Sequence, residues 1–252
     1  MYPILARYGS LFVYSYTVVM ALGIIVGIGL ISWSSRHNKV PDWFDALLVV
    51  MAAGLVGGRL GFVIWRWDYF QGQPFEGWQI WNGGLSYHAA LLAGIAALIG
   101  WAVVGKRSFY RYAALFAPAF VVVTIFSWAA CWLDGCAYGR ETVLGLLSAD
   151  LADEFGVFAV RYQTQLAGIL LTLIVLPFIL WYQKNGPTNT VFWLALAAVS
   201  LTHLLIGLFR GDQSPASGTM RLDSLVNAVL VLLSLGLLQY ERLKNKHTEE
   251  NS

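Results

Sequence analysis

Seven stretches of the chain are predominantly apolar for about 20 residues, the length that a helix needs to cross a hydrocarbon core about 30 Å thick. They run from Leu11 to Trp33, Trp43 to Trp65, Leu85 to Val104, Tyr112 to Leu133, Gln165 to Tyr182, Val191 to Phe209 and Leu222 to Tyr240. Hydrophobic residues make up 58% of the chain and charged residues only 12%, which excludes an ordinary soluble domain. We therefore predict an all-α fold, a polytopic membrane helical bundle of about seven transmembrane helices.

The basic residues are distributed unevenly among the connections between these segments. Nine of them occupy alternate connections and the C-terminal tail: Arg36, Lys39, Lys106, Arg107, Arg111, Lys184, Arg242, Lys244 and Lys246. Because Lys and Arg accumulate on the cytoplasmic side, we expect the C-terminus to be cytoplasmic and the N-terminus to lie outside. Residues 1–252 are expected to form a single transmembrane domain with outer-face loops at about 66–84 and 134–164. The net charge of +2 is too small and too dispersed for a nucleic-acid surface.

Two polar side chains stand in or beside the second and third apolar segments. Arg59 lies among glycines that allow a neighbouring backbone to come close. It is expected either to pair with a carboxylate or with helix-end carbonyls, or to bind an anionic lipid head group. His88 follows a pair of glycines that favours a turn or a broken helix end. It is either an interhelical hydrogen bonder or a group that exchanges a proton near neutral pH.

Two further arginines lie at the predicted outer face. Arg140 follows Gly139 at the start of the longest outer loop, where it could hold a phosphate bidentately or simply extend to the membrane interface. Arg210 ends the sixth segment and is expected either to pair with Asp212 or to contact an anionic substrate. Four outer or intramembrane polar groups of this kind favour an anionic substrate that enters from the outer leaflet.

Cys131 and Cys136 lie five residues apart at the outer end of the fourth segment. In a continuous helix they would point in different directions, so a disulfide requires a break near Gly135. We rank plain apolar packing first, a disulfide second and catalysis third. Two thiols without nearby histidines do not make a zinc site, so no metal is expected.

Six segments resemble, in the same order, motifs of the bacterial prolipoprotein diacylglyceryl transferases. They are YSYTVVMALG, GGRLGFV, GGLSYHAALLAG, DGCAYGR, RYQTQL and LFRGD. The residues retained at the family positions are Tyr16, Arg59, His88, Gly139, Arg140 and Arg210. The resemblance covers most of the chain and implies the same membrane fold.

The resemblance implies transfer of a diacylglyceryl group from phosphatidylglycerol to the lipobox cysteine of a prolipoprotein. The products would be a thioether and glycerol phosphate, and no cofactor is implied. The resemblance places the protein in the bacterial cytoplasmic (inner) membrane as a multi-pass protein. It implies catalytic roles for Tyr16, His88 and Arg210, and substrate binding by Arg59, Gly139, Arg140 and Arg210. The nucleophile is the cysteine of the incoming peptide.

The sequence also departs from the family motifs. Trp128 stands where the family has an arginine, and Cys131 stands where it has an asparagine. The two glycines after the family histidine are Ala89 and Ala90. These differences leave a second interpretation, a phospholipid-binding or assembly membrane protein of the same fold that has lost the chemistry. Transport ranks last, because no convincing inverted repeat is found.

Overall fold

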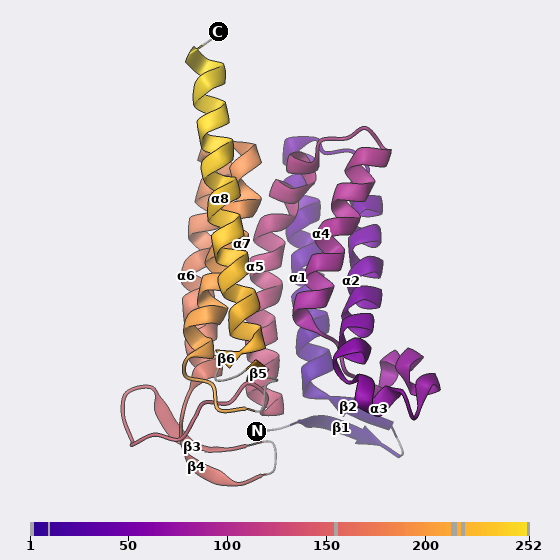
Figure 1. The fold of residues 1–252 in the computed structure, drawn as a ribbon, viewed down its shortest axis with the longest axis vertical. Helices are drawn as coiled ribbons and strands as arrows, with labels where there is room; N and C mark the ends of the chain where they lie inside the picture. Colours follow the sequence, from indigo (N-terminus) through magenta and orange to yellow (C-terminus); the bar gives the residue numbers. More distant parts are fainter. Residues whose placement is uncertain (1–2, 10, 154–155, 213–215, 218–219, 251–252) are drawn as a thin grey trace. The chain divides into compact units, whose positions relative to one another are not determined.

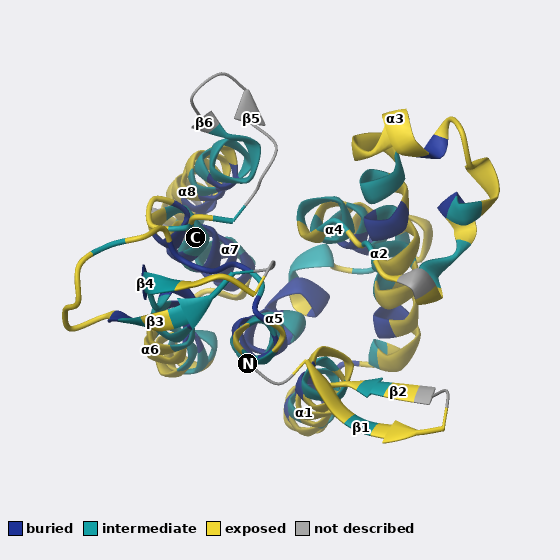
Figure 2. Ribbon diagram, turned by 90° about the horizontal axis from the view of Figure 1, so that it is seen from below, coloured by how far each residue is buried: buried dark blue, intermediate teal, exposed yellow. Residues whose placement is uncertain are grey.

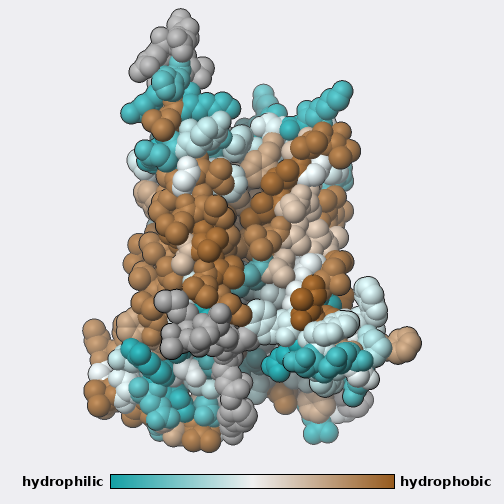
Figure 3. Space-filling view, in the orientation of Figure 1, coloured by the Kyte–Doolittle hydropathy of each residue, from teal (hydrophilic) through white to brown (hydrophobic). Residues whose placement is uncertain are grey.

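The computed structural model describes residues 3–9, 11–153, 156–212, 216–217 and 220–250. Within these ranges seven helices are long and apolar enough to cross a membrane (Figure 1). They are α1 (Ser15–Asn38), α2 (Trp43–Trp65), α4 (Tyr87–Val104), α5 (Phe109–Asp134), α6 (Thr164–Asn185), α7 (Thr188–Gly207) and α8 (Leu222–Glu250). Figure 3 shows hydrophobic side chains over the middle of the spanning helices and hydrophilic ones toward their ends. The predicted polytopic helical membrane bundle is confirmed, whereas the orientation of the termini stays a prediction.

In the described part of the chain, three short antiparallel strand pairs, which the sequence analysis did not predict, accompany the helices. They are β1 (Ile4–Tyr8) with β2 (Leu11–Tyr14), β3 (Ser148–Ala152) with β4 (Phe158–Tyr162), and β5 (Ala216–Ser217) with β6 (Met220–Arg221). The start predicted for the first helix at Leu11 is therefore wrong, since residues 11–14 pair with β1 instead. Hydropathy alone does not separate a short apolar strand from the first turn of a helix. The connection at 66–84 also contains α3 (Trp67–Phe70) and the 3-10 turns η1 (Pro74–Trp78) and η2 (Ile80–Asn82).

The chain divides into two compact units, each described by itself below. One unit contains residues 35–113, and the other contains residues 1–34 and 114–252. The expectation of a single domain over residues 1–252 stays a prediction.

In the unit of residues 35–113, α2 packs against α4 through small residues. A Cβ added to Gly58 would lie 3.1 Å from the Cβ of Ala90, and one added to Gly61 would collide with the Cβ of Ala89. The two helix backbones therefore come as close as the predicted glycine contact requires. The glycines of α2 also explain how alanine is accommodated at positions 89 and 90.

In the other unit, α7 packs against both α6 and α8, and α1 packs against α5. Figure 2 shows buried residues along α5 and α7. At the contact of α1 with α5, a Cβ added to Gly23 would lie 2.7 Å from the Phe126 ring, so the aromatic side chain occupies the space left by the glycine. These helices carry the segment from Cys131 to Arg140 and the turn after α7.

Candidate functional site

Gly139 and Arg140 lie where the chain leaves α5, in a backbone frame formed by three separate segments. Gly139 forms an antiparallel bridge with Arg210. The amide of Arg140 donates to the carbonyl of Phe209 at 2.9 Å, and the amide of Tyr162 donates to the carbonyl of Arg140 at 3.2 Å. A Cβ on Gly139 would lie only 2.7 Å from the Cβ of Tyr162, so this position requires glycine.

The guanidinium of Arg140 projects from this frame with aromatic rings beside it. Its central carbon lies 5.8 Å from the ring centre of Tyr162 and 5.7 Å from that of Phe209. Arg140 is exposed, and its side chain makes no hydrogen bond or ion pair with any residue that the structure describes. The adjacent carboxylate, Glu141, pairs with Arg161 at 3.3 Å instead. Arg140 is therefore a cation of fixed backbone position whose donors are open to an anion.

Arg210 is held differently, in a network of two arginines and two aspartates. It donates to both carboxylate oxygens of Asp212 and, at 3.2 Å, to Asp223. Arg221 pairs with the same two carboxylates, each at 3.2 Å. Burial by itself lowers the pKa of Arg210, but the hydrogen bonds and charge of Asp212 and the charge of Asp223 outweigh it and raise that pKa above its usual value.

The four side chains of this network have a formal charge of zero. The local pair of Arg210 with Asp212, one of the two sequence-based alternatives, is present and is extended by Arg221 and Asp223. A phosphate that contacted Arg210 would lie close to two carboxylates, which would repel it. Arg210 is consequently less suited to hold an anion by itself than Arg140.

Cys131 and Cys136 form a disulfide bond, with their Cα atoms 4.7 Å apart. The preference for plain apolar packing of these residues is therefore wrong. A disulfide required a break in the helix near Gly135, and the structure has that break. The helix α5 ends at Asp134, and Gly135 has a φ of +87°, in the left-handed region. The chain turns there and brings the second cysteine back to the first.

Residues at the start of α6 hold the same turn from the other side. The side-chain amide of Gln165 donates to the carbonyl of Cys136 at 2.8 Å, and the hydroxyl of Thr164 donates to the carbonyl of Ala137 at 2.6 Å. Both donors are buried. The segment that leads to Arg140 is therefore held by one covalent bond and several hydrogen bonds.

Trp128 fills the space beneath this turn. It is 4% exposed, and its ring centre lies 5.0 Å from that of His203 on α7. On another side a Cβ added to Gly168 would lie 2.6 Å from the indole, so the glycine makes room for the ring. Trp128 packs with Ala137 and contributes shape and apolar area but no charge.

Tyr16 is the second residue of α1 and belongs to the same unit as Arg140. Its hydroxyl hydrogen-bonds the side chain of Ser127 on α5, and the charge of Asp134 acts on it. The structure thus places Tyr16 beside the C-terminal half of α5, whereas its catalytic role stays a prediction.

Arg59, in the unit of residues 35–113, is buried and surrounded by backbone carbonyls. Its Nε donates to Gly77 at 2.7 Å, its Nη2 to Glu76 at 2.6 Å, and its Nη1 to Gly84 at 3.0 Å and to Gly83. Four of the five N–H groups of the guanidinium are thereby used. Of the two sequence-based alternatives, the structure shows the pairing with carbonyls, and Arg59 ties the connection at 66–84 to α2.

His88 is the second residue of α4 in the same unit. The turn before it contains Gly83 and Gly84, whose φ values of +78° and +81° confirm the predicted turn. Ser86 caps the helix, and its amide donates to the carbonyl of Gly58 on α2 at 2.9 Å. His88 and Arg59 are therefore positioned by the same pair of helices.

The structure groups the predicted site residues into two sets. Tyr16, Gly139, Arg140 and Arg210 belong to one unit, and Arg59 and His88 belong to the other. The prediction that the three arginines and His88 serve one anionic substrate stays a prediction. Sequence analysis missed Asp223 as a shared partner of Arg210 and Arg221, although acidic and basic residues at the adjoining ends of two successive spans were a visible signal.

His203 was also missed. As a histidine inside an apolar segment, it met the same criterion as His88. Within the described part of the chain, no group of three or more His, Cys, Asp or Glu side chains is placed to hold a metal ion.

Comparison with known proteins places this arrangement in a family. The sequence profile described as prolipoprotein diacylglyceryl transferase matches residues 3–240. The chain belongs to the prolipoprotein diacylglyceryl transferase family. Family membership accounts for the order of the six motifs.

Relatives in the family are similar over nearly their whole length, at low identity. The chain is 24% identical to the phosphatidylglycerol–prolipoprotein diacylglyceryl transferase of Listeria welshimeri, with 96% of this chain and 90% of the relative covered. It is 27% identical to the enzyme of that name from Halalkalibacterium halodurans, with 96% and 86% covered. For the Lysinibacillus sphaericus enzyme the identity is 26%, with 97% and 93% covered.

Proposed function

We propose that this protein transfers a diacylglyceryl group from phosphatidylglycerol to the lipobox cysteine thiol in a prolipoprotein signal peptide. The cysteine sulfur attacks the glycerol carbon that carries the phosphodiester. A C–S bond forms, the C–O bond breaks, and glycerol phosphate leaves with the bonding electron pair. The thiol proton passes to a base on the enzyme, because the thiolate is the nucleophile. Family membership and the names of the relatives support this activity.

The observation that carries the proposal is the open guanidinium of Arg140. The phosphodiester of phosphatidylglycerol has one negative charge, and the departing phosphate monoester approaches two. A cation that strengthens its hold as this charge develops accelerates the reaction. Arg140 has no acidic partner among the described residues, and its backbone is fixed by Phe209 and Tyr162.

We assign the other residues supporting roles. His88 accepts the thiol proton, and Tyr16 orients a reacting group as a hydrogen-bond donor. Gly139 contributes the close backbone approach that positions Arg140. Arg210 anchors the facing segment through its bridge with Gly139, and Arg59 shapes the connection before His88.

Transfer by the purified protein in phosphatidylglycerol vesicles, with a lipobox peptide as acceptor, tests the proposal. Arg140→Ala is expected to lower kcat/KM by about 10²- to 10³-fold, as the loss of one transition-state donor does elsewhere. Arg140→Lys should retain part of the rate because the charge is kept. Arg66→Ala is the matched control, since Arg66 is another exposed arginine in a predicted outer connection.

Two outcomes would contradict the proposal. Failure of the parent protein to form any thioether, under conditions in which an established transferase does so, would reject the activity. Equal rates for Arg140→Ala and Arg66→Ala would reject the role of Arg140 while leaving the activity intact.

The role of His88 needs its own measurement. His88→Gln and His88→Ala should lower the transfer rate and remove an ionisation near neutral pH from the pH profile of kcat/KM. If both variants keep the rate and the pH profile of the parent, the proton goes elsewhere.

Seven apolar helices make this a multi-pass membrane protein. We place it in the bacterial cytoplasmic membrane, with the N-terminus, the connection at 66–84 and Arg140 on the outer side. This orientation follows from the basic residues of the alternate connections. A reporter that is active only in the cytoplasm should be active when fused after α8, and one that is active only outside the cytoplasm should be inactive there. The opposite result would contradict this topology.

A second function is favoured by two specific observations. The buried, uncharged Trp128 stands at a position where the family motif has an arginine. The positive charge of Arg210 is neutralised by Asp212 and Asp223. These features fit a phospholipid-binding or assembly protein of the same fold. Selective binding of phosphatidylglycerol that Arg140→Ala weakens, without any thioether product, would identify this alternative.

A further inference from the structure

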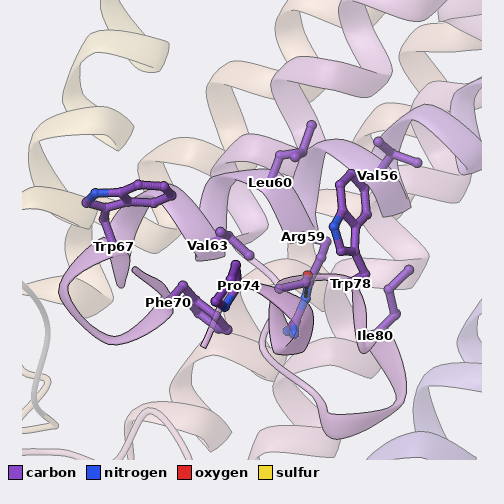
Figure 4. A pocket seen from close by; sticks show the side chains of 10 residues that line it. Val56, Arg59, Leu60, Val63, Trp67, Phe70, Pro74, Trp78 and Ile80 are labelled. Carbon is purple, nitrogen blue, oxygen red and sulfur yellow. Dashed lines mark hydrogen bonds between the residues drawn. The ribbon is translucent and has the colours of Figure 1, made fainter. Parts of the chain in front are cut away.

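An apolar cavity lies beside Arg59, in the unit of residues 35–113. It encloses about 250 Å³ between the outer part of α2 and the connection that follows it. Val56, Leu60 and Val63 line it from α2, and Trp67, Phe70 and Trp78 line it from the connection. In Figure 4, Trp78 stands beside Val56, and Trp67 lies on the opposite side of Val63.

The wall contributed by α2 is a stripe on one face of the helix. Val56, Leu60 and Val63 are four and three residues apart, so their side chains follow one another along the axis. At a rise of 1.5 Å per residue, the stripe extends for about 10 Å along the helix. The wall on α2 thus runs along the helix axis, the direction in which α2 crosses the membrane.

This wall is continuous with the exposed apolar surface of α2. Val56 is 51% exposed and Leu60 is 45% exposed, and both also line the cavity. On a spanning helix such a surface meets hydrocarbon, so the cavity opens toward the lipid chains. An apolar void in that position loses dispersion contacts unless a chain fills it.

The other wall has the residues of a membrane interface. Trp67 and Trp78 are 58% and 72% exposed. Tryptophan is enriched where hydrocarbon meets the head groups, because its ring is apolar and its N–H is polar. Arg59 lies at this end, and its neighbours Tyr69 and Glu76 line a second, more polar cavity of about 300 Å³.

The polar cavity shares Arg59 and Phe70 with the apolar one. The phenol of Tyr69 donates to the carboxylate of Glu76 at 2.7 Å. The apolar cavity and the polar one are therefore neighbours separated by these shared side chains, and the apolar one matches an acyl chain. Because four N–H groups of Arg59 are used by carbonyls, its main task is to hold the wall between the two compartments.

We infer that this cavity is a lipid site, in which one acyl chain of a bilayer glycerophospholipid lies along α2 between the valine and leucine side chains of the helix and the rings of Trp67 and Trp78. Lipid binding at this site does not require transfer chemistry, so the test of the site is independent of the test of the proposed function. The lipid chain fits better than a peptide, because the channel offers almost no polar lining to pair with a peptide backbone.

Photocrosslinking of the whole protein in vesicles tests the inference. The probe is phosphatidylglycerol with a diazirine in the middle of one acyl chain, and adducts are mapped by proteolysis and mass spectrometry. Adducts are expected to concentrate within residues 56–80, above the level on Leu170 and Ile174, which are exposed on α6. The transferase assay is run in parallel, so that loss of activity and loss of the lipid site are scored independently.

Two variants sharpen the result. Val63→Trp fills the channel and should abolish the adducts within 56–80, whereas Ile64→Trp, at an adjacent position that is 72% exposed and outside the lining, should leave them. Adducts spread evenly over the exposed helices, or unchanged in Val63→Trp, would overturn the site. Preferential labelling of residues 56–80 by a diazirine-bearing signal peptide would show that a peptide, and not a lipid chain, occupies the cavity. If Val63→Trp does not fold, the distribution of adducts on the parent decides the question.

Discussion

Replacement of Gly139 by alanine tests whether a close backbone contact holds Arg140 in position. The new Cβ would lie 2.7 Å from the Cβ of Tyr162 and 2.8 Å from its carbonyl carbon. The carbonyl oxygen of Tyr162 would lie closer still. An ordinary contact begins at 3.4 Å, so one of the two backbones must retreat by more than about 0.7 Å. The obstacle is main chain, which has no alternative rotamer to adopt.

The loss of folding free energy in Gly139→Ala can be worked out from the hydrogen bonds of the same backbone frame. The amide of Arg140 donates to Phe209 at 2.9 Å, that of Gly211 to Tyr138 at 2.8 Å, and that of Tyr162 to Arg140 at 3.2 Å. Loss of one such bond costs about 0.5–1.5 kcal/mol, and overpacking costs about 1–3 kcal/mol. Gly139→Ala is therefore expected to lower the free energy of unfolding by about 2–4 kcal/mol. Displacement of Arg140 on this scale should reduce transfer by about 10²-fold.

The assay combines the thermal unfolding midpoint of the purified protein with the transfer rate in vesicles. Gly145→Ala is the matched control, because Gly145 lies in the same connection and a Cβ there would have no neighbour closer than 3.9 Å. Both quantities should fall for Gly139→Ala and stay at the parent values for Gly145→Ala. Equal midpoints and equal rates for the two variants would refute the argument from close backbone approach.

Three further predictions concern the residues around this frame and the connection after α2. Cys131→Ser or Cys136→Ser removes a bridge across five residues and should lower stability by about 2 kcal/mol, the loop-entropy value for so short a loop, measured as a lower unfolding midpoint. Gly168→Ala places a Cβ 2.6 Å from the buried indole of Trp128 and should cost about 1–3 kcal/mol by the same measurement. Arg59→Met leaves four carbonyls without their donor, so stability should fall by about 3 kcal/mol or more and proteolysis within 66–84 should become faster.

Each of these changes has a control and a contradicting result. Labelling of both Cys131 and Cys136 by iodoacetamide in the unreduced protein would show that the bridge is absent. Gly29→Ala has no neighbour within 4 Å and should be neutral, and a loss equal to that of Gly168→Ala would remove the steric explanation. Arg66→Met should leave the cleavage rate unchanged, and an equal increase in both arginine variants would contradict the role of Arg59.

The three candidate arginines share one residue type but have different partners. Arg59 is occupied by backbone carbonyls, Arg210 by two carboxylates, and Arg140 by neither within the described residues. Only the last arrangement leaves a guanidinium ready for a phosphate. The structure thereby concentrates the proposed phosphate contact on Arg140, which the sequence alone ranked with the other two.

The spanning helices could be predicted from the sequence because a bilayer imposes a local requirement. Each segment must by itself be long and apolar enough to cross the hydrocarbon, so each is visible without knowledge of its neighbours. The turn at Gly83 and the close approach at Gly58 were predicted for a similar reason, since glycine permits conformations that other residues avoid. The family motifs likewise nominated six candidate site residues by order alone, and their roles stay predictions.

The partners of those residues were decided only by the tertiary structure. Arg59 meets carbonyls 17 to 25 residues further along the chain, and Arg210 meets Asp223 across the turn between two helices. The bridge between Cys131 and Cys136 depended on whether α5 ended before the second cysteine. Hydropathy records whether a side chain can be buried, but the charge that neutralises it, or the acceptor that satisfies it, is set by which segments the fold brings into contact.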